Sequence, residues 1–273
     1  MTTTPLSQIL IREPAEAYHA QAGKYLSSHL LATFRECPLT YQWMVSGRMP
    51  DRDRPAYLVG RALHALALEG REAYQAAYAV GGPLNPKTGK PYGADTNAFR
   101  DYAAGLGKDV LSNDQADLVE HMAASLKGHS FIRELLVTGY AERVVRCQHR
   151  GIPCQARFDW VSTLPHLAII DLKTTDNLTW FEADARRFQY AHQMAFYRSV
   201  LAQALSVEVL AVAVHLIAVE KQPPYRCGLW RMGQECLAIA QAENEAAMER
   251  LLVCRQTGQW VTGYESVREF QSV

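Results

Sequence analysis

Two short stretches, Arg157-Phe158-Asp159 and Asp171-Leu172-Lys173, decide the fold that we expect for this chain. The first lies within residues 154–161, where apolar and polar side chains alternate in the period-two pattern of a half-buried strand. Asp159 stands on the polar side of this strand and is therefore expected to face away from the core. The connection that follows, residues 162–166, is rich in turn-forming residues. We therefore expect the two stretches to lie on adjacent, paired strands.

The second stretch ends a strand that begins with the apolar run Leu167-Ala168-Ile169-Ile170. Asp171 and Lys173 lie two residues apart on this strand and so share a face. Carboxylates on adjacent strands can hold Mg²⁺, and a neighbouring lysine can orient or help deprotonate an attacking water. These are the parts that hydrolysis of a phosphodiester requires. Asp-x-Lys also occurs by chance, so a surface ion pair on a hairpin is the alternative interpretation.

Further strands are predicted on both sides of this pair. A strand over residues 142–147 precedes it and completes a three-strand meander through Leu172. Glu142 begins that strand and either adds a third carboxylate to the cluster or keeps an edge strand soluble. Residues 207–219 form a nearly continuous apolar run, typical of a strand covered on both faces, and residues 225–232 predict one more strand.

Helices are predicted to fill most of the remaining chain. Their expected ranges are residues 27–45 with a break at Pro38, 57–70, 94–104, 113–128 opened by a capping box, 182–205 and 234–255. Residues 81–93 have the composition of a long exposed loop. The predicted fold class is therefore α/β, with a mixed sheet core flanked by helices and a helical N-terminal half. We expect one domain over residues 1–273, in which 1–140 are mainly helical and 141–273 form the sheet core.

Two of the predicted helices carry further candidate site residues. Gly60 and His64 lie one turn apart on the helix 57–70, where the missing side chain of Gly60 leaves room beside the imidazole. A packed histidine is the alternative to a ligand. On the helix 182–205, whose buried side we draw through Phe188, the residues Gln193 and Tyr197 point the same way. They either reach a phosphate or base over the sheet, or show ordinary helix polarity.

Composition restricts location and redox state more than function. The chain has 28 Lys and Arg against 28 Asp and Glu, so net charge gives no argument for a polyanionic partner. No apolar run approaches the length of a membrane span, and the start Met1-Thr2-Thr3-Thr4-Pro5 lacks the pattern of an export signal. We therefore expect a cytoplasmic protein with no membrane partner. The six cysteines form no Cys-x-x-Cys pair, which argues against a zinc site and for reduced thiols.

Four motifs in order resemble the RecE/RecB branch of the PD-(D/E)xK nucleases. They are Gly60-x-x-x-His64, Arg157-x-Asp159, Asp171-x-Lys173 and Gln193-x-x-x-Tyr197. The sequences around His64 and Asp171 are similar to the phage exonuclease VIII type, the C-terminal part of RecE. Ser27-Ser28-His29-Leu30 with the later Cys37-Pro38 fits that family's opening helix, so the resemblance covers most of the chain. The proline that names the superfamily is missing before Asp159, where Phe158 stands, as is common in this branch.

The resemblance implies a role for each motif. His64, Asp159 and Asp171, with the backbone carbonyl of Leu172, would bind a divalent metal, Mg²⁺ with Mn²⁺ able to substitute. Lys173 would act on the attacking water. The residues that would position DNA or the lysine are Arg157, Gln193 and Tyr197, and Glu142 corresponds to a further acidic position of the family. Some relatives carry an iron–sulphur cluster, but Cys227, Cys236 and Cys254 are too dispersed to match it, so we expect none.

The resemblance also implies a substrate and partners. The family digests one strand of linear double-stranded DNA in the 5′→3′ direction and leaves a 3′ tail for a RecT-like annealing protein. Some members form a homo-oligomeric ring around DNA. We therefore expect a DNA exonuclease acting on duplex ends in a bacterial or phage-infected cell. The alternatives are a nuclease of the same fold that prefers single strands or cuts internally, and a non-catalytic DNA-end-binding module.

Overall fold

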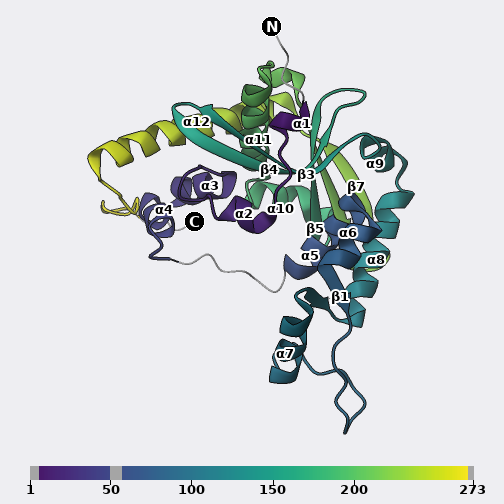
Figure 1. The fold of residues 1–273 in the computed structure, drawn as a ribbon. Coiled ribbons are helices and arrows are strands. Elements are labelled where there is room, and N and C mark those ends of the chain that lie inside the picture. Colours follow the sequence, from purple (N-terminus) through teal and green to yellow (C-terminus); the bar gives the residue numbers. More distant parts are fainter. Residues whose placement is uncertain (1–5, 50–56, 270–273) are drawn as a thin grey trace.

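A mixed five-stranded sheet forms the centre of the computed structural model, which describes residues 6–49 and 57–269 (Figure 1). Its order is β3-β4-β5-β6-β7, and all neighbours are antiparallel except β5 and β6. The strands are β3 (Gly139–His149), β4 (Ile152–Ser162), β5 (Ala168–Thr175), β6 (Ala213–Glu220) and β7 (Cys227–Arg231). The predicted mixed sheet core flanked by helices is confirmed. Met1–Pro5, on which the expectation about export signals depends, lie outside the described residues.

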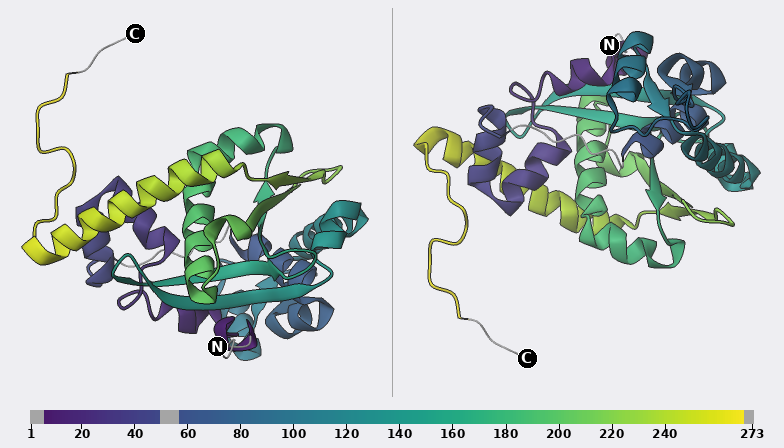
Figure 2. Two further views of the ribbon diagram at one scale, coloured as in Figure 1. Left: turned by 90° about the horizontal axis from the view of Figure 1, so that it is seen from above. Right: turned by 90° about the horizontal axis from the view of Figure 1, so that it is seen from below.

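Helices cover both faces of this sheet and enclose one hydrophobic core on each side (Figure 2). The first face packs against α3 (Ser28–Glu36), α11 (Tyr190–Leu205) and α12 (Gln234–Thr257), with Phe34, Val200 and Leu251 in its core. The second packs against α5 (Tyr57–His64), its π-helical continuation η1 (Ala65–Glu69) and α8 (Asn113–Gly128). Trp160 and Ile170 point into this second core. The central strands β4, β5 and β6 are therefore mostly buried, whereas the edge strands β3 and β7 are largely half-buried.

Local sequence signals account for several boundaries. Cys37 ends α3 and also caps α4 (Pro38–Val45), whose first residue is the proline predicted to break the helix. The capping box of α8 is present, because the Ser112 hydroxyl accepts from the Gln115 N–H while the Gln115 side chain accepts from the Ser112 N–H. The loop over residues 81–93 projects from the body of the protein beside α7 (Asn97–Leu106), as predicted (Figure 1).

The remaining elements are short and connect these layers. They are α1 (Leu6–Ile9), α2 (Ala15–His19), α6 (Arg71–Ala77), α9 (Ser130–Leu135), α10 (Phe181–Arg187), η2 (Leu178–Trp180) and η3 (Val209–Ala211), with a parallel two-stranded sheet of β1 (Tyr78–Val80) and β2 (Asp109–Leu111). Sequence analysis missed this small sheet, because strands of three residues leave no measurable alternation. Among the described helices, none is long and apolar enough to cross a membrane.

The single helix predicted over residues 182–205 is wrong. Two helices, α10 and α11, occupy this range and meet at Phe188 and Gln189, where Gln189 has a left-handed backbone with φ of 56°. Phe188, which we placed on the buried side, is 54% exposed. The junction contains neither Gly nor Pro, so no local signal indicated it. The break turns the Phe188 side chain outward.

The strand predicted over residues 207–219 is correct only in its second half. Strand β6 begins at Ala213, and each of its residues is buried, as the apolar run predicted. The first residues instead form the 3₁₀ turn η3, in which Leu210 is 72% exposed. Ser206, at φ 54°, ends α11, and the chain uses the following residues to return from the helical layer to the sheet.

Candidate functional site

The two predicted motif strands separate just where their acidic residues stand. Strands β4 and β5 pair only through Trp160–Ser162 with Ala168–Ile170, so the predicted pairing is confirmed over this short segment alone. Beyond it the Asp159 carboxylate spans the gap and accepts a hydrogen bond of 2.8 Å from the Leu172 N–H. The first half of β4 continues beside β3 instead. The strands therefore form a fork, and Asp159 and Asp171 lie at its branch point.

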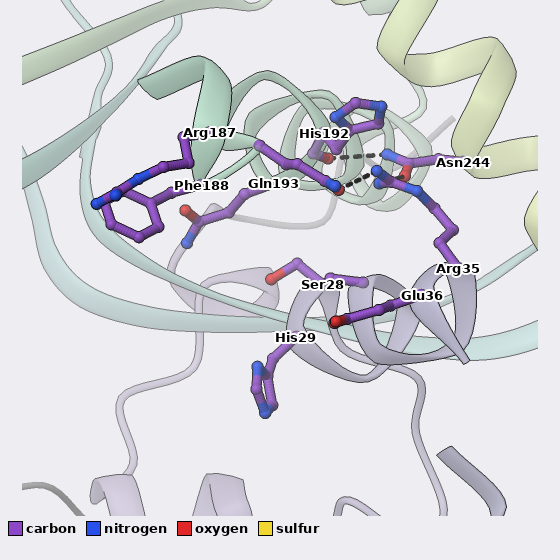
Figure 3. A pocket seen from close by; sticks show the side chains of 11 residues that line it. Ser28, His29, Arg35, Glu36, Arg187, Phe188, His192, Gln193 and Asn244 are labelled. Atoms are coloured by element: carbon purple, nitrogen blue, oxygen red, sulfur yellow. Dashed lines mark hydrogen bonds between the residues drawn. The ribbon is translucent and has the colours of Figure 1, made fainter. Parts of the chain in front are cut away.

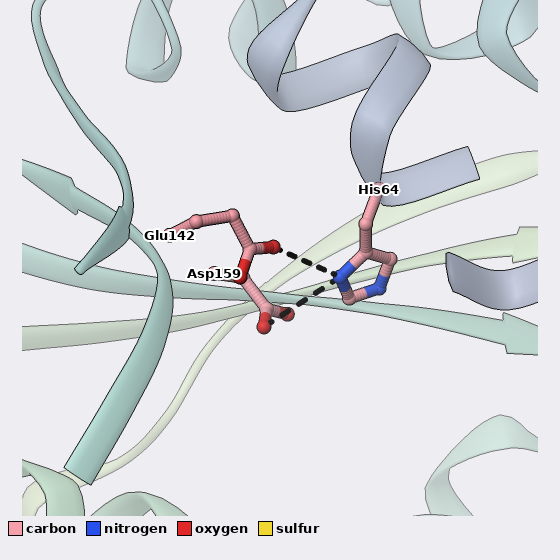
Figure 4. Close-up of side chains that lie close together, drawn as sticks. All are labelled: His64, Glu142 and Asp159. Atoms are coloured by element: carbon pink, nitrogen blue, oxygen red, sulfur yellow. Dashed lines mark ion pairs between the residues drawn. The ribbon is translucent and has the colours of Figure 1, made fainter. Parts of the chain in front are cut away.

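A histidine and two carboxylates converge on this fork. The Nδ1 atom of His64 lies 3.6 Å from Asp159 Oδ1 and 3.7 Å from Glu142 Oε1 (Figure 4). Its Nε2 atom lies 2.9 Å from the carbonyl oxygen of Leu172. His64 is the last residue of α5 before the π-helical turn η1, and π-helical turns are frequent at functional sites. Among the described residues, His64, Glu142 and Asp159 form a group that can hold a metal ion.

Glu142 reaches this group through an irregularity in β3. Its backbone is left-handed, with φ of 50°, and the ladder between β3 and β4 is interrupted there while the register continues on both sides. A residue with a side chain adopts this conformation at a cost of about 1–3 kcal/mol, and such residues cluster at functional sites. Arg157 fixes the carboxylate by donating from Nε to Glu142 Oε2 at 2.9 Å. Arg157 thus positions Glu142, and its predicted contact with substrate stays a prediction.

Burial and mutual charge shift the pKa values of this group. Burial alone would lower the pKa of His64, but the carboxylates of Asp159 and Glu142 outweigh it and raise the pKa to about 9. Burial raises the pKa of Asp159 to about 7, helped by the charges of Asp171 and Glu142 and opposed by His64. The pKa of Glu142 is lowered, because hydrogen bonds and charge from His64 and Arg157 exceed the effect of its burial. The site thus concentrates negative charge that a cation would relieve.

Asp171 and Lys173 face the α11 side of the same fork. Lys173 Nζ lies 2.7 Å from Asp171 Oδ2, and the Asp171 side chain is 3% exposed. Lys173 also donates to Gln193 Oε1 at 3.3 Å, and Gln193 Nε2 donates to the Tyr197 hydroxyl at 3.2 Å. The structure therefore brings the predicted pair on α11 into contact with the predicted lysine. Burial lowers and the two aspartates raise the pKa of Lys173, and the net shift is upward.

Sequence reasoning missed one neighbour of the lysine. Lys173 Nζ lies 4.8 Å from the centre of the Tyr190 ring, in cation–π contact. Tyr190 stands three residues before Gln193 on α11, so the same helical spacing that selected Gln193 and Tyr197 could have found it.

One protein family matches the chain over most of its length, including the residues of this site. The model of the family described as "PDDEXK-like domain of unknown function (DUF3799)" matches residues 27–269. The chain belongs to this PDDEXK-like family. The matched residues contain every element of the fork, including α5 with His64 and α11 with Gln193. No curated protein matches the chain.

One solved structure shares the fold of this chain over nearly its whole length. A protein from Eubacterium rectale named "Putative exonuclease" matches with a TM-score of 0.64 at 13% identity, over 96% of this chain and 97% of that one. This likeness supports the fold alone, because the identity is low. The alkaline exonuclease LHK-Exo from Laribacter hongkongensis also matches, with a TM-score of 0.29 at 15% identity over 60% of this chain and 87% of that one.

PDDEXK nucleases use divalent metals, and the donor atoms at the fork fit such an ion. Three carboxylates and one carbonyl are the hard oxygen ligands that Mg²⁺ and Mn²⁺ prefer, and an imidazole is compatible with them. Asp171 Oδ2 is buried and is paired with Lys173 Nζ at 2.7 Å, so an ion bound there would share this oxygen with the lysine. Of the predicted ligands, His64 and Asp159 lie in a compact group with Glu142, and the assignment of Asp171 as a ligand stays a prediction.

A cavity of about 330 Å³ adjoins the fork on the α11 side. Gln193 lines it and also contacts Lys173, so the cavity opens beside the fork. Arg35 and Asn244 lie on one side of it, and Arg187 and Phe188 lie on the other (Figure 3). Sequence analysis did not predict this cavity, since it depends on the break between α10 and α11.

Proposed function

We propose that this PDDEXK-like protein is a Mg²⁺-dependent DNA exonuclease of the RecE/exonuclease VIII type. The observation that carries the proposal is the meeting of His64, Glu142 and Asp159 with the Asp171–Lys173 pair at the branch point of β4 and β5. An acidic group with one amine beside it matches what phosphodiester hydrolysis requires, namely ligands for a cation and positive charge near the reacting phosphate.

Each side chain has a role in this proposal. A divalent cation held by His64, Asp159, Asp171 and the Leu172 carbonyl would polarise a phosphoryl oxygen and lower the pKa of water. Lys173, restrained by Asp171 and Gln193, orients the attacking water and stabilises the charge that develops on the phosphate. Tyr197 in turn holds Gln193 in place. Glu142 supplies negative charge next to His64 and Asp159.

Digestion of linear duplex DNA tests the activity itself. We expect cleavage with Mg²⁺, cleavage with Mn²⁺ and none with chelator. Asp171→Ala should lose activity by about a hundred- to a thousandfold, the order reached when a group central to transition-state stabilisation is removed. The exposed residue Glu249 gives the matched control, Glu249→Gln, which should cleave normally. Equal degradation in all these samples would reject a metal-dependent nuclease. Binding of DNA ends without any cleavage would instead favour the non-catalytic end-binding module.

The direction and the need for an end are tested separately. A duplex labelled at either the 5′ or the 3′ end of one strand should release the 5′ label first and leave a 3′ single-stranded tail. Covalently closed circular duplex should survive. Cleavage of the circle, or faster digestion of single strands than of duplex, would replace the proposal with the internally cutting or single-strand-preferring alternative.

The proposed type also implies assembly and a partner. A ring would have a mass that is a multiple of 30.6 kDa, which light scattering measures directly. A RecT-like annealing protein is the proposed recipient of the 3′ tails. Co-purification with such a protein, tested in the presence of a nuclease inhibitor, would support this role.

A further inference from the structure

An aromatic side chain is exposed at the junction of α10 and α11. Phe188 is 54% exposed and lies between the end of α10 and the start of α11. The left-handed backbone of Gln189 starts α11 in a new direction and leaves the Phe188 ring outside both helices. The ring is nevertheless supported from one side, because Tyr190 stacks against it with ring centres 5.9 Å apart and planes 27° apart. The Phe188 ring is therefore fixed in position by Tyr190 and accessible to solvent.

A line of contacts joins this surface to the proposed catalytic lysine. Lys173 Nζ lies 4.8 Å from the Tyr190 ring centre, and Tyr190 stacks on Phe188. On Phe188, the Arg187 guanidinium carbon lies 4.4 Å from the ring centre (Figure 3). The Arg187 side chain is 70% exposed and its one described ion pair, with Asp184, has a length of 3.5 Å at the surface. Arg187 is therefore free to move away from the ring.

The cavity in front of the ring has room and polar groups for a nucleotide. Its volume is about 330 Å³, within the range of small-molecule sites. Across it, Arg35 donates to Asn244 Oδ1 at 3.0 Å and to Gln189 Oε1, and no carboxylate of the described residues lies within ion-pair distance of it. Glu36 also lines the cavity, so its lining is of mixed charge. Electrostatic attraction alone would not select a ligand there, whereas an aromatic face would.

We propose that Phe188 is a base-stacking residue, on which the nucleobase of a nucleotide next to the scissile phosphate rests while Arg187 covers the base from its other side. This inference rests on the proposed nuclease function and deepens it by naming how the end of the strand is held. Bases stack on aromatic rings and on arginine planes in proteins that bind single strands. Arg187 occupies the place of the base in the free protein.

A double-mutant cycle between protein and DNA tests this contact without cleavage. The binding of fluorescent frayed duplexes is measured by anisotropy in chelator and in Ca²⁺, with an abasic site placed in turn at each of the first four nucleotides from the 5′ end. In the wild-type protein we expect one position at which base removal weakens binding about tenfold, the order of one base–aromatic contact. Phe188→Ala should weaken binding of intact DNA equally and be insensitive to the abasic site at that position. Phe188→Trp should restore both properties.

Phe131 provides the matched control, since it is 65% exposed on α9, away from this cavity. Phe131→Ala should bind intact and abasic DNA like the wild type. The inference is overturned if Phe188→Ala and base removal act additively at all four positions, or if Phe131→Ala has the same effect as Phe188→Ala. The test measures affinity and so does not require cleavage. If Phe188 and the base prove coupled but the protein does not cleave DNA, the nuclease function is rejected and base stacking on Phe188 is retained.

Discussion

At the scale of single residues, Glu142 shows how the fold accommodates the site. Its strand neighbours pair normally with β4, yet its own backbone is left-handed, and its carboxylate is held by Arg157 next to His64. Sequence analysis left two roles for this residue, a third carboxylate or an edge-strand solubiliser. A buried, oriented carboxylate in the metal-ligand group favours the first of them.

We expect Glu142→Gln to bind Mg²⁺ and Mn²⁺ about 10–100-fold more weakly, because it removes one negative charge from the group without changing its shape. Calorimetry of the metal-free protein measures this affinity. Glu142→Gly should bind metal as weakly but be at least as stable to denaturant, since glycine adopts a positive φ without strain. Metal affinity unchanged in both variants would assign Glu142 to sheet structure alone.

His215, which lies outside the group of His64, Glu142 and Asp159, predicts how the free energy of unfolding depends on pH. Burial, followed by the charges of Arg231 and His166, lowers the pKa of His215 to about 4. In the unfolded chain His215 has a pKa near 6.5. Between about pH 6.5 and 4 it is therefore protonated in the unfolded chain and neutral in the folded one. The contribution of His215 to the free energy of unfolding should therefore fall as pH decreases through this window, by about 2 kcal/mol between pH 7.5 and 5, while the raised pKa of Asp159 acts in the opposite direction.

Urea denaturation at pH 7.5 and 5 measures this loss. Relative to the wild type, His215→Gln should gain about that amount of stability at pH 5 compared with pH 7.5, whereas the same change at the exposed residue His19 should give no such shift. An equal pH dependence in wild type and His215→Gln would show that other groups carry the acid sensitivity.

At the scale of elements, helix ends decide where the chain turns. Ser206 ends α11 in a left-handed conformation with φ of 54°, and it is exposed. Glycine is the usual residue at such a position, because a side chain there is strained. We expect Ser206→Gly to raise the free energy of unfolding by about 0.5–1 kcal/mol and Ser206→Ala to leave it unchanged or lower. Denaturant midpoints compare the variants, and a destabilising Ser206→Gly would contradict the strain.

The same elements show which parts of the fold a sequence can reveal. The capping box at Ser112 and the break at Pro38 were predicted because their signals lie within four residues. The two helices around Gln189 were not, because a left-handed glutamine has no local signal. The site residues Asp159, Asp171 and Lys173 follow from strand alternation and motif order. The fork that brings them together does not, since it depends on where β5 leaves β4 for β6, which is a long-range property.

At the scale of the whole molecule, the candidate metal-binding residues come from elements that pack in different hydrophobic cores. His64 belongs to α5 on the second face of the sheet, whereas Asp171 and Lys173 face α11 on the first. Asp159 comes from β4, which separates from β5 at the fork, and Glu142 comes from β3, the partner of β4 on its other side. Without a cation, the pKa of Asp159 is raised, chiefly because burial disfavours its charge and in smaller part because the Asp171 and Glu142 carboxylates lie near it. A bound cation would therefore stabilise the molecule as a whole as well as its proposed chemistry.

We expect Mg²⁺ at 100 times its dissociation constant to raise the free energy of unfolding by about 2.7 kcal/mol, and chelator to reverse the change. Each kcal/mol corresponds to roughly 2–4 °C in midpoint for a chain of this size, so thermal scans resolve it. Asp159→Asn and His64→Gln should lose the response, because each removes a ligand from a different side of the fork, while Glu249→Gln should keep it.

Hydrogen exchange of the Leu172 amide should slow with Mg²⁺, since its acceptor is the Asp159 carboxylate. A midpoint equal with Mg²⁺ and with chelator would mean that the fork holds no divalent ion.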